Sequence, residues 1–215
     1  MPPQKQKRLT ILTLVLTSLL SFSTGHGASV LKITMDEMLT GSELVFEGRV
    51  LSVESKQTAP KRIHTFVICE IKEIIKGEYP TQTITLRFLG GTVGNLTMAV
   101  SDIHLPREGE RGIYFVESLE RNQVHPLYGW SQGHFTVATD DTGTDRVMTP
   151  KNQPITGICF DAESVQQTNG RKAIKAFSTG VATGVTIEQN QKETKGLPLN
   201  EFKQALRERL NETNQ

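Results

Sequence analysis

The sequence predicts a mainly β protein: a small closed or partly closed antiparallel barrel of the OB type, with a short N-terminal helix and a C-terminal amphipathic helix. Three observations indicate this fold. Several runs rich in β-branched residues are separated by turns containing Gly or Pro, and most of these runs alternate between apolar and polar residues. Apolar residues at helical spacing occur clearly only near the start and the end of the chain that follows the expected signal peptide. We expect five or six strands within residues 43–137.

The first 27 residues are expected to be a signal peptide. Three basic residues precede the apolar run Leu9–Phe22, and small residues follow it. The run has fourteen residues, whereas a bilayer span needs about 20, so a retained membrane anchor is the less favoured alternative. We expect cleavage after Gly27, a secreted or periplasmic location, and no stable membrane span in the mature protein.

Charge and length limit the partners and the number of domains. The chain has 24 Lys and Arg against 23 Asp and Glu, and the leader contains three of the basic residues and none of the acidic ones. The remaining 21 basic and 23 acidic residues give a net charge of −2, so nucleic acid is not an expected partner. We expect a β-barrel domain over residues 28–160, a polar linker over 161–197, and a helix with a tail over 198–215.

The N-terminal helix is predicted by a capping box. Thr34 and Glu37 have the required spacing, so a short helix should cover Met35–Leu39 and stop at Gly41. The strand pattern "ELVFEGRVLSVES" follows it. Its internal glycine, Gly48, predicts a bulge or a sharp bend.

The stretch "FVICEIKEIIKGE", residues 66–78, fits two secondary structures. Its isoleucines have near-helical spacing, but its first residues alternate as in a strand. The run is dense in β-branched residues and lies between other strand-like runs, so we predict a strand over residues 64–75. A bulge near Glu73 would explain why two isoleucines are adjacent.

Further strands are predicted in "TQTITLRFL", "PREGERGIYFVE" and "GWSQGHFTVAT", and "GGTVGNLTMAV" is predicted to be a glycine loop with a short strand. The final stretch "PLNEFKQALRERLNE" predicts a helix with Asn200 as its N-cap. Phe202, Ala205, Leu206 and Leu210 share one face of that helix. Packing of this face on the barrel is preferred to docking on a partner.

The two cysteines, Cys69 and Cys159, leave two alternatives open. In an exported protein they could form one disulfide that closes a long loop. Alternatively each is a small buried apolar residue, since Cys69 lies in a strand-like run where Val would serve equally well.

Sequence motifs do not predict a catalytic or metal site. "GWSQG" matches the G-x-S-x-G nucleophile elbow around Ser131, but a strand pattern follows it and no histidine occurs after His134. The histidines His64, His104, His125 and His134 lack the H-E-x-x-H spacing, and the chain has no C-x-x-C. "GGTVGN" does not lead into a helix that could hold a phosphate. We therefore expect no catalytic residues, no metal and no cofactor.

The succession "SELVFEGRVLSVES", "FVICEIKEIIKGE", "TITLRFLGGTVG" and "REGERGIYFVE" resembles small exported bacterial proteins. It also resembles the strand order of the netrin-like OB barrel of tissue inhibitors of metalloproteinases, over residues 44–137. The resemblance implies a barrel that presents binding loops. Those inhibitors begin with a cysteine that caps the protease zinc, and they contain many disulfides. This chain has neither feature, so their inhibitory mechanism is not transferred to any of its residues.

These observations favour an exported, non-catalytic binding module with a protein partner, for which an exported protease is one candidate. The alternatives are a structural cell-surface or matrix protein, or a hydrolase with an unrecognised site. Two loops are the expected contacts, because glycines allow close approach and aromatic residues are common interface anchors. For Trp130, burial as a plug of the barrel is an open alternative. The candidate binding residues are Gly90, Gly91, Thr92, Val93, Gly94, Asn95, Tyr128 and Trp130.

Overall fold

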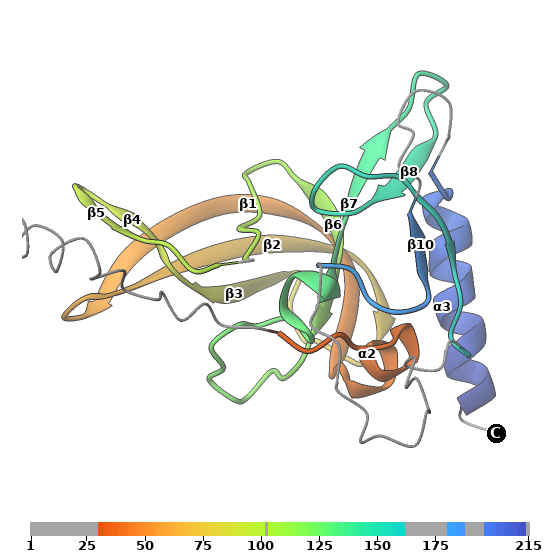
Figure 1. The fold of residues 1–215 in the computed structure, drawn as a ribbon, viewed down its shortest axis with the longest axis horizontal. Coiled ribbons are helices and arrows are strands. Elements are labelled where there is room, and N and C mark those ends of the chain that lie inside the picture. The colour runs from red at the N-terminus through yellow and green to blue at the C-terminus, as the bar shows by residue number, and fades with distance from the viewer. Residues whose placement is uncertain (1–29, 102, 162–179, 188–195, 214–215) are drawn as a thin grey trace, which may run out of the picture.

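A computed structural model describes residues 30–101, 103–161, 180–187 and 196–213. The predicted signal peptide and much of the predicted linker lie outside these residues. The centre of the molecule is an antiparallel six-stranded sheet with the order β3-β2-β1-β6-β7-β8 (Figure 1). The described elements are α2 (Met35–Gly41), β1 (Leu44–Ala59), β2 (Arg62–Lys76), β3 (Thr83–Leu89), β4 (Gly91–Val93), β5 (Leu96–Met98), β6 (Arg111–Val116), the 3-10 helix η1 (Trp130–Gly133), β7 (His134–Thr139), β8 (Asp145–Met148), β9 (Ile155–Ile158), β10 (Val185–Ile187) and α3 (Leu199–Thr213).

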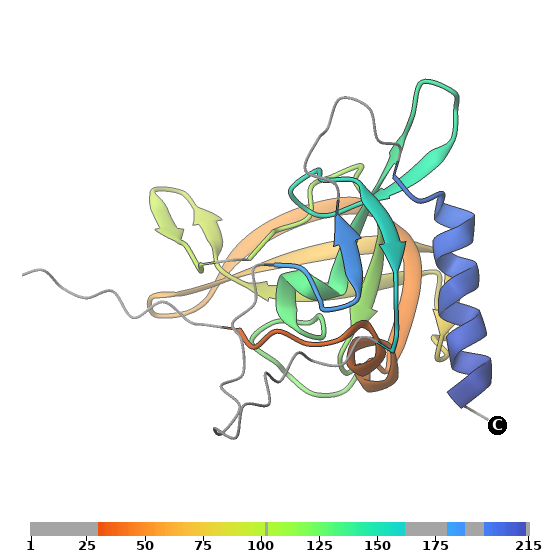
Figure 2. The same ribbon diagram turned by 45° about the vertical axis from the view of Figure 1, so that its right-hand side comes forward.

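The mainly β class with two helices is confirmed, but closure into a barrel is not. Strands β3 and β8 form the two edges of the central sheet and do not pair with each other. The sheet is therefore open. It is strongly curved, because β1 and β2 arch across the molecule (Figures 1 and 2).

The long strands β1 and β2 confirm that residues 66–75 are extended. Their pairing shifts register beside Gly48, where Glu47 pairs with Glu73 but Gly48 pairs with Ile71. A Cβ atom on Gly48 would lie 2.9 Å from the backbone oxygen of Glu70, so the bend requires glycine. The predicted bulge near Glu73 is thus present, and it lets the two strands bend without losing their pairing.

Both faces of the sheet are buried near its centre, which explains the almost uninterrupted apolar run of β6. Ile113 and Phe115 point to a core shared with the two helices, whereas Tyr114 and Val116 point to a second core inside the curl of β1, β2 and β3. The first core includes Met35, Met38, Leu39, Val45, Ile113, Phe115, Phe135, Val147, Ile155, Leu199, Phe202 and Leu206. The second includes Leu44, Phe46, Val50, Val67, Cys69, Ile84, Leu86, Phe88, Tyr114, Val116 and Leu127.

Both predicted helices are confirmed, but α3 begins at Leu199, so Asn200 lies inside the helix and is not its N-cap. The Thr34 side chain accepts a hydrogen bond from the backbone of Glu37, and Glu37 accepts one from the backbone of Thr34, which is the predicted capping box. Helix α3 packs against β2 and β8 and buries Phe202 and Leu206. Lys203 also attaches this helix to the sheet, because its ammonium group lies 2.7 Å from a carboxylate oxygen of Glu47 on β1.

Part of the predicted linker forms a strand. Strand β10 pairs with β9, and Thr183 bonds through its backbone to Ile33 and Met35 beside α2. Residues 162–179 and 188–195 of that linker lie outside the described residues. In the part of the chain that the structure describes, no helix is both long and apolar enough to cross a membrane.

Candidate functional site

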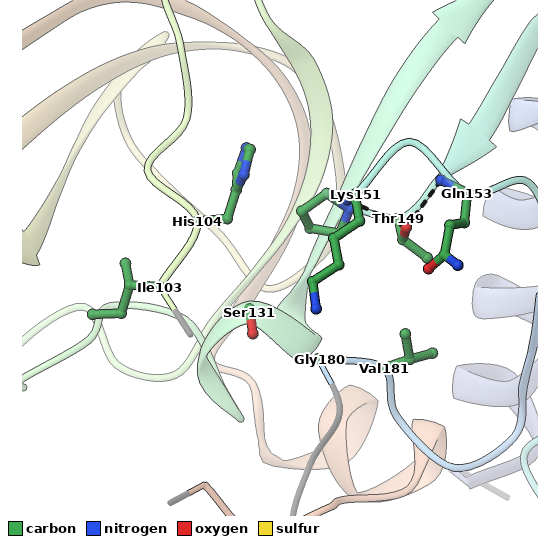
Figure 3. Close-up of a pocket in the computed structure, with 9 residues that line it drawn as sticks. Ile103, His104, Ser131, Thr149, Lys151, Gln153, Gly180 and Val181 are labelled. Atoms are coloured by element: carbon green, nitrogen blue, oxygen red, sulfur yellow. Dashed lines mark hydrogen bonds between the residues drawn. The ribbon is translucent and has the colours of Figure 1, made fainter. Parts of the chain in front are cut away.

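A cavity of about 170 Å³ lies where four segments of the chain meet (Figure 3). One wall comes from the loop before β6, one from η1, one from the turn between β8 and β9, and one from the segment that leads into β10. The lining residues are Ile103, His104, Ser131, Thr149, Pro150, Lys151, Gln153, Gly180 and Val181. The cavity therefore combines apolar walls with a small number of polar groups, as ligand sites do.

Two polar side chains converge on one side of this cavity. A Cβ atom placed on Gly180 would lie 3.8 Å from the Ser131 hydroxyl oxygen and 4.0 Å from Lys151 Nζ. In Figure 3 the Lys151 side chain extends toward Ser131 and Gly180. The ion pairs among the described residues do not include Lys151, so its ammonium group offers a positive charge and three hydrogen-bond donors to a ligand.

The turn that carries Lys151 is held in place before any ligand binds. The buried Thr149 hydroxyl accepts hydrogen bonds from the backbone N–H groups of Lys151 (3.3 Å) and Gln153 (3.1 Å). The Thr136 hydroxyl on β7 donates to the Thr149 carbonyl at 3.1 Å. These bonds tie the turn to the sheet, so the backbone beneath the lysine is preorganised.

A second polar cluster is formed by His104, Glu110 and His134, and of these residues only His104 lines the cavity. His134 is the first residue of β7 and pairs with Tyr114 on β6, while Glu110 directly precedes β6. Glu110 Oε2 lies 3.4 Å from His104 Nε2, and Glu110 Oε1 lies 3.3 Å from His134 Nε2. One ligand atom from each of the three residues lies within 4.8 Å of the other two, so this cluster could hold a metal ion.

Several polar atoms of this cluster are buried without a hydrogen-bond partner in the described part of the chain. They include Glu110 Oε1, both ring nitrogens of His134, and the hydroxyl of Tyr114. A buried polar group left without a partner costs about 1–3 kcal/mol. Such a cost is typical of a site whose groups have a role beyond folding.

The protonation states of the cluster suit ligand binding. Burial lowers the pKa of His134 and outweighs the opposing influence of the Glu110 carboxylate, which favours the neutral imidazole. Burial raises the pKa of Glu110, but its interactions with the nearby imidazoles of His104 and His134 outweigh this and bring its pKa to about 2. The stable combination near neutral pH is an ionised carboxylate between imidazoles.

A stack of aromatic rings fixes the orientation of His134. Its ring lies 4.7 Å from the ring of Tyr114 with an interplanar angle of 17°, and Tyr114 in turn stacks on Phe46 at 5.2 Å. On the other side, the ring of His104 lies 5.3 Å from that of His134. Rotation of the imidazole is thereby restricted, so its nitrogens keep their position beside Glu110.

The structure places the predicted contact segments in two separate regions. Residues 90–95 form β4 and its turn toward β5, a hairpin at one end of the molecule, whereas η1 lies near the middle (Figures 1 and 2). The first residues of this glycine segment are closely packed. Gly90 is buried, and a Cβ atom on Gly91 would collide with the hydroxyls of Ser55 and Thr65. Thr92, Gly94 and Asn95 are exposed, and their role in binding stays a prediction.

Tyr128 and Trp130 are half-buried. The Tyr128 ring packs so closely on Gly41, the last residue of α2, that a Cβ atom there would collide with it. Trp130 stacks on the buried His125, with ring centroids 5.5 Å apart and an interplanar angle of 7°. Trp130 is therefore neither a plug of the core nor a fully exposed anchor, but its neighbour Ser131 does line the cavity.

The remaining sequence candidates have simple structural surroundings. Ser131 lies in η1, which leads directly into β7, so the strand–turn–helix geometry of a nucleophile elbow does not occur around it. Cys69 is buried and Cys159 is exposed, and both are free. The disulfide that the sequence allowed is thus not formed in this structure.

Sequence reasoning missed Lys151, Glu110 and the proximity of His104 to His134. His104 and Glu110 are six residues apart, and His134 lies a further strand away, so no local spacing motif reports their proximity. The antiparallel pairing of β6 and β7 places His134 opposite Tyr114, four residues from Glu110, so strand pairing alone does not predict this contact.

No family model, no curated protein and no solved structure matches this chain.

Proposed function

We propose that this protein is an exported, non-catalytic binding module that recognises a partner protein through the cavity beside η1. The ligand is a carboxylate of the partner, carried by an acidic side chain or by the end of its chain. The observation that carries this proposal is the Lys151 ammonium group, which extends toward Ser131 without an acidic partner among the described residues.

The size of the cavity supports a side chain or a chain end as its occupant. Pockets for whole small-molecule ligands usually measure about 300–1,000 Å³, whereas this cavity measures about 170 Å³. Ile103, Pro150 and Val181 provide an apolar wall for the aliphatic part of such a group. Lys151 and Ser131 can then donate hydrogen bonds to its carboxylate.

The half-buried Trp130 supports a protein partner. It precedes Ser131 in η1 and therefore lies next to the cavity along the chain. Aromatic side chains beside a pocket are common anchors of protein interfaces. Tyr128 contributes less, because its ring is packed on α2.

Reversal of the charge at Lys151 tests this proposal. Purified mature protein is cross-linked to the exported proteins of the same organism, and captured partners are identified by mass spectrometry. Affinity for a captured partner is then measured for the wild type and for Lys151→Glu. We expect at least about a tenfold loss, because a carboxylate placed near the new glutamate would be repelled.

The matched control is Lys61→Glu, at the turn between β1 and β2. It makes the same change of charge on an exposed lysine at the far end of the long hairpin (Figure 1). Equal affinities for the Lys151 variant and this control would refute the carboxylate site. Export is tested separately, by N-terminal sequencing of protein from the medium or envelope. We expect a mature N-terminus between His26 and Val30.

A further inference from the structure

Two residues of the cluster, Glu110 and His134, are held in place by the sheet. The backbone of Val50 on β1 donates a hydrogen bond to the carbonyl of Glu110 and accepts one from Gly109, both at 2.9 Å. His134 is held by the pairing of β7 with β6 and by the ring of Tyr114. The carboxylate and the buried imidazole therefore meet on rigid elements, which is the condition for a selective site.

The spacing of these groups fits a metal ion better than direct ion pairs. Charge-assisted hydrogen bonds between nitrogen and a carboxylate are usually about 2.7–2.9 Å long. Here the two imidazoles lie 3.3 and 3.4 Å from the carboxylate oxygens. A tetrahedral zinc ion, bound at about 2.0–2.1 Å, separates its ligand atoms by about 3.3–3.4 Å. Each imidazole thus stands at ligand spacing from a different oxygen of Glu110, and one ligand atom from each of the three residues lies within 4.8 Å of the other two.

The charge of the cluster also fits a cation. Among the described residues, the ion-pair partners of Glu110 are the two histidines and no lysine or arginine. The Glu110 side chain is 16% exposed, so its carboxylate lies in a mostly buried place. A divalent cation would balance that charge and would use the nitrogen lone pairs that have no partner.

Gly112 keeps space open at the buried imidazole. A Cβ atom on this residue would lie 2.6 Å from the backbone oxygen of Phe135 and 3.1 Å from His134 Nε2. The residue lies in the middle of β6, opposite Thr136 on β7, where the strand would otherwise favour a larger side chain. A side chain at this position would therefore press on the β7 backbone and on the imidazole, and glycine leaves room for both.

We infer that His104, Glu110 and His134 bind one divalent transition-metal ion, and that zinc fits the site best. Two imidazole nitrogens and one carboxylate oxygen are a known set of zinc ligands that leaves a fourth position for water or another ligand. Harder cations such as magnesium and calcium prefer oxygen ligands and are not expected to compete. This site goes beyond the proposed partner cavity and depends on different groups, although His104 contributes to both.

Metal binding to the purified mature protein tests the inference. The protein is treated with a chelator, dialysed, and titrated with zinc in competition with a chromophoric chelator. We expect one zinc ion per chain, and at least a 100-fold weaker binding for His104→Ala. His104 is the variant of choice because its side chain is 24% exposed and lies on a loop, so its loss should leave the fold intact. Glu110→Gln should weaken zinc binding as well.

Two controls separate this site from other effects. His64→Ala removes a histidine that lies outside the cluster and bonds to Thr58, so it should bind zinc as the wild type does. Lys151→Glu should also keep its zinc, even where it loses the partner. At free zinc 100 times the dissociation constant, the unfolding equilibrium of the wild type should shift about 100-fold toward the native state, and that of His104→Ala should not. Equal zinc affinity for the wild type and His104→Ala, or no binding by the wild type, would overturn the inference.

Discussion

The attachment of α3 to the sheet depends on Lys203, and its replacement by methionine should destabilise the protein strongly. The lysine side chain is 9% exposed, and its ammonium group lies 2.7 Å from Glu47 and 2.7 Å from Glu73. Burial lowers the pKa of Lys203, but the hydrogen bonds to these two carboxylates outweigh it and raise the pKa overall. The lysine is therefore charged in the native state.

The expected magnitude follows from what the substitution leaves behind. Removing one partner of a buried ion pair costs about 3–5 kcal/mol, because the other charge stays buried. Glu47, whose side chain is 8% exposed, retains Arg111 at 3.2 Å, and Glu73 is 39% exposed and retains Arg207. Because each glutamate keeps one cationic partner, we expect the loss in the free energy of unfolding to lie at the lower end of this range, about 3 kcal/mol.

Equilibrium unfolding in urea, followed by circular dichroism, measures this cost. With a slope of about 2 kcal/mol/M, a loss of about 3 kcal/mol lowers the midpoint by about 1.5 M. The matched control is Lys72→Met on β2, whose exposed pair with Glu70 should contribute about 0–1 kcal/mol. Adding Glu47→Gln to the Lys203 variant should cost less than the sum of the two single changes. A Lys203→Met protein as stable as the Lys72→Met protein would refute this reasoning.

Three further outcomes are expected from local structure. Thr34→Ala removes the capping box of α2 and should lower the free energy of unfolding by about 1 kcal/mol, measured in urea against Thr81→Ala as an exposed control. Burial raises the pKa of the Cys69 thiol to about 12, so a thiol reagent at pH 8 should modify only Cys159 in the native protein and both cysteines in denaturant; two reactive native thiols would contradict this. The pKa of Asp140 is lowered by hydrogen bonds, mainly from Thr142 and to a smaller extent from Arg146. The contribution of Asp140 to stability should therefore be complete above about pH 4 and be lost as the pH falls further. Asp140→Asn should flatten that acid-side loss in thermal melts.

Local sequence patterns predicted the elements that local physics determines. The capping box of Thr34 specified the start of α2, and the β-branched density of residues 66–75 outweighed their near-helical spacing. The bend at Gly48 was predicted because a glycine inside a strand pattern indicates a bulge or a bend. The structure shows the reason, since a Cβ atom there would lie too close to the Glu70 carbonyl. The apolar face of α3, with Phe202 in the core, was readable from its period.

Features that depend on distant residues were not predictable in the same way. Closure of a barrel requires the two edge strands to meet, and the curvature that β1 and β2 adopt leaves β3 and β8 apart. Strand β10 has only three residues and lies in a polar stretch, so its apolar pattern is too short to predict a strand. The cluster of His104 and His134 depends on how the loop before β6 folds back on β7, which no spacing motif encodes.

Anomalous diffraction at the zinc absorption edge, from crystals of the mature protein grown with zinc, tests most directly the claim that the buried His and Glu cluster is a functional site. We expect one strong peak about 2.0–2.2 Å from His104 Nε2, His134 Nε2 and a carboxylate oxygen of Glu110. Zinc peaks only at other places on the molecule, with the three side chains arranged as they are here, would contradict the claim.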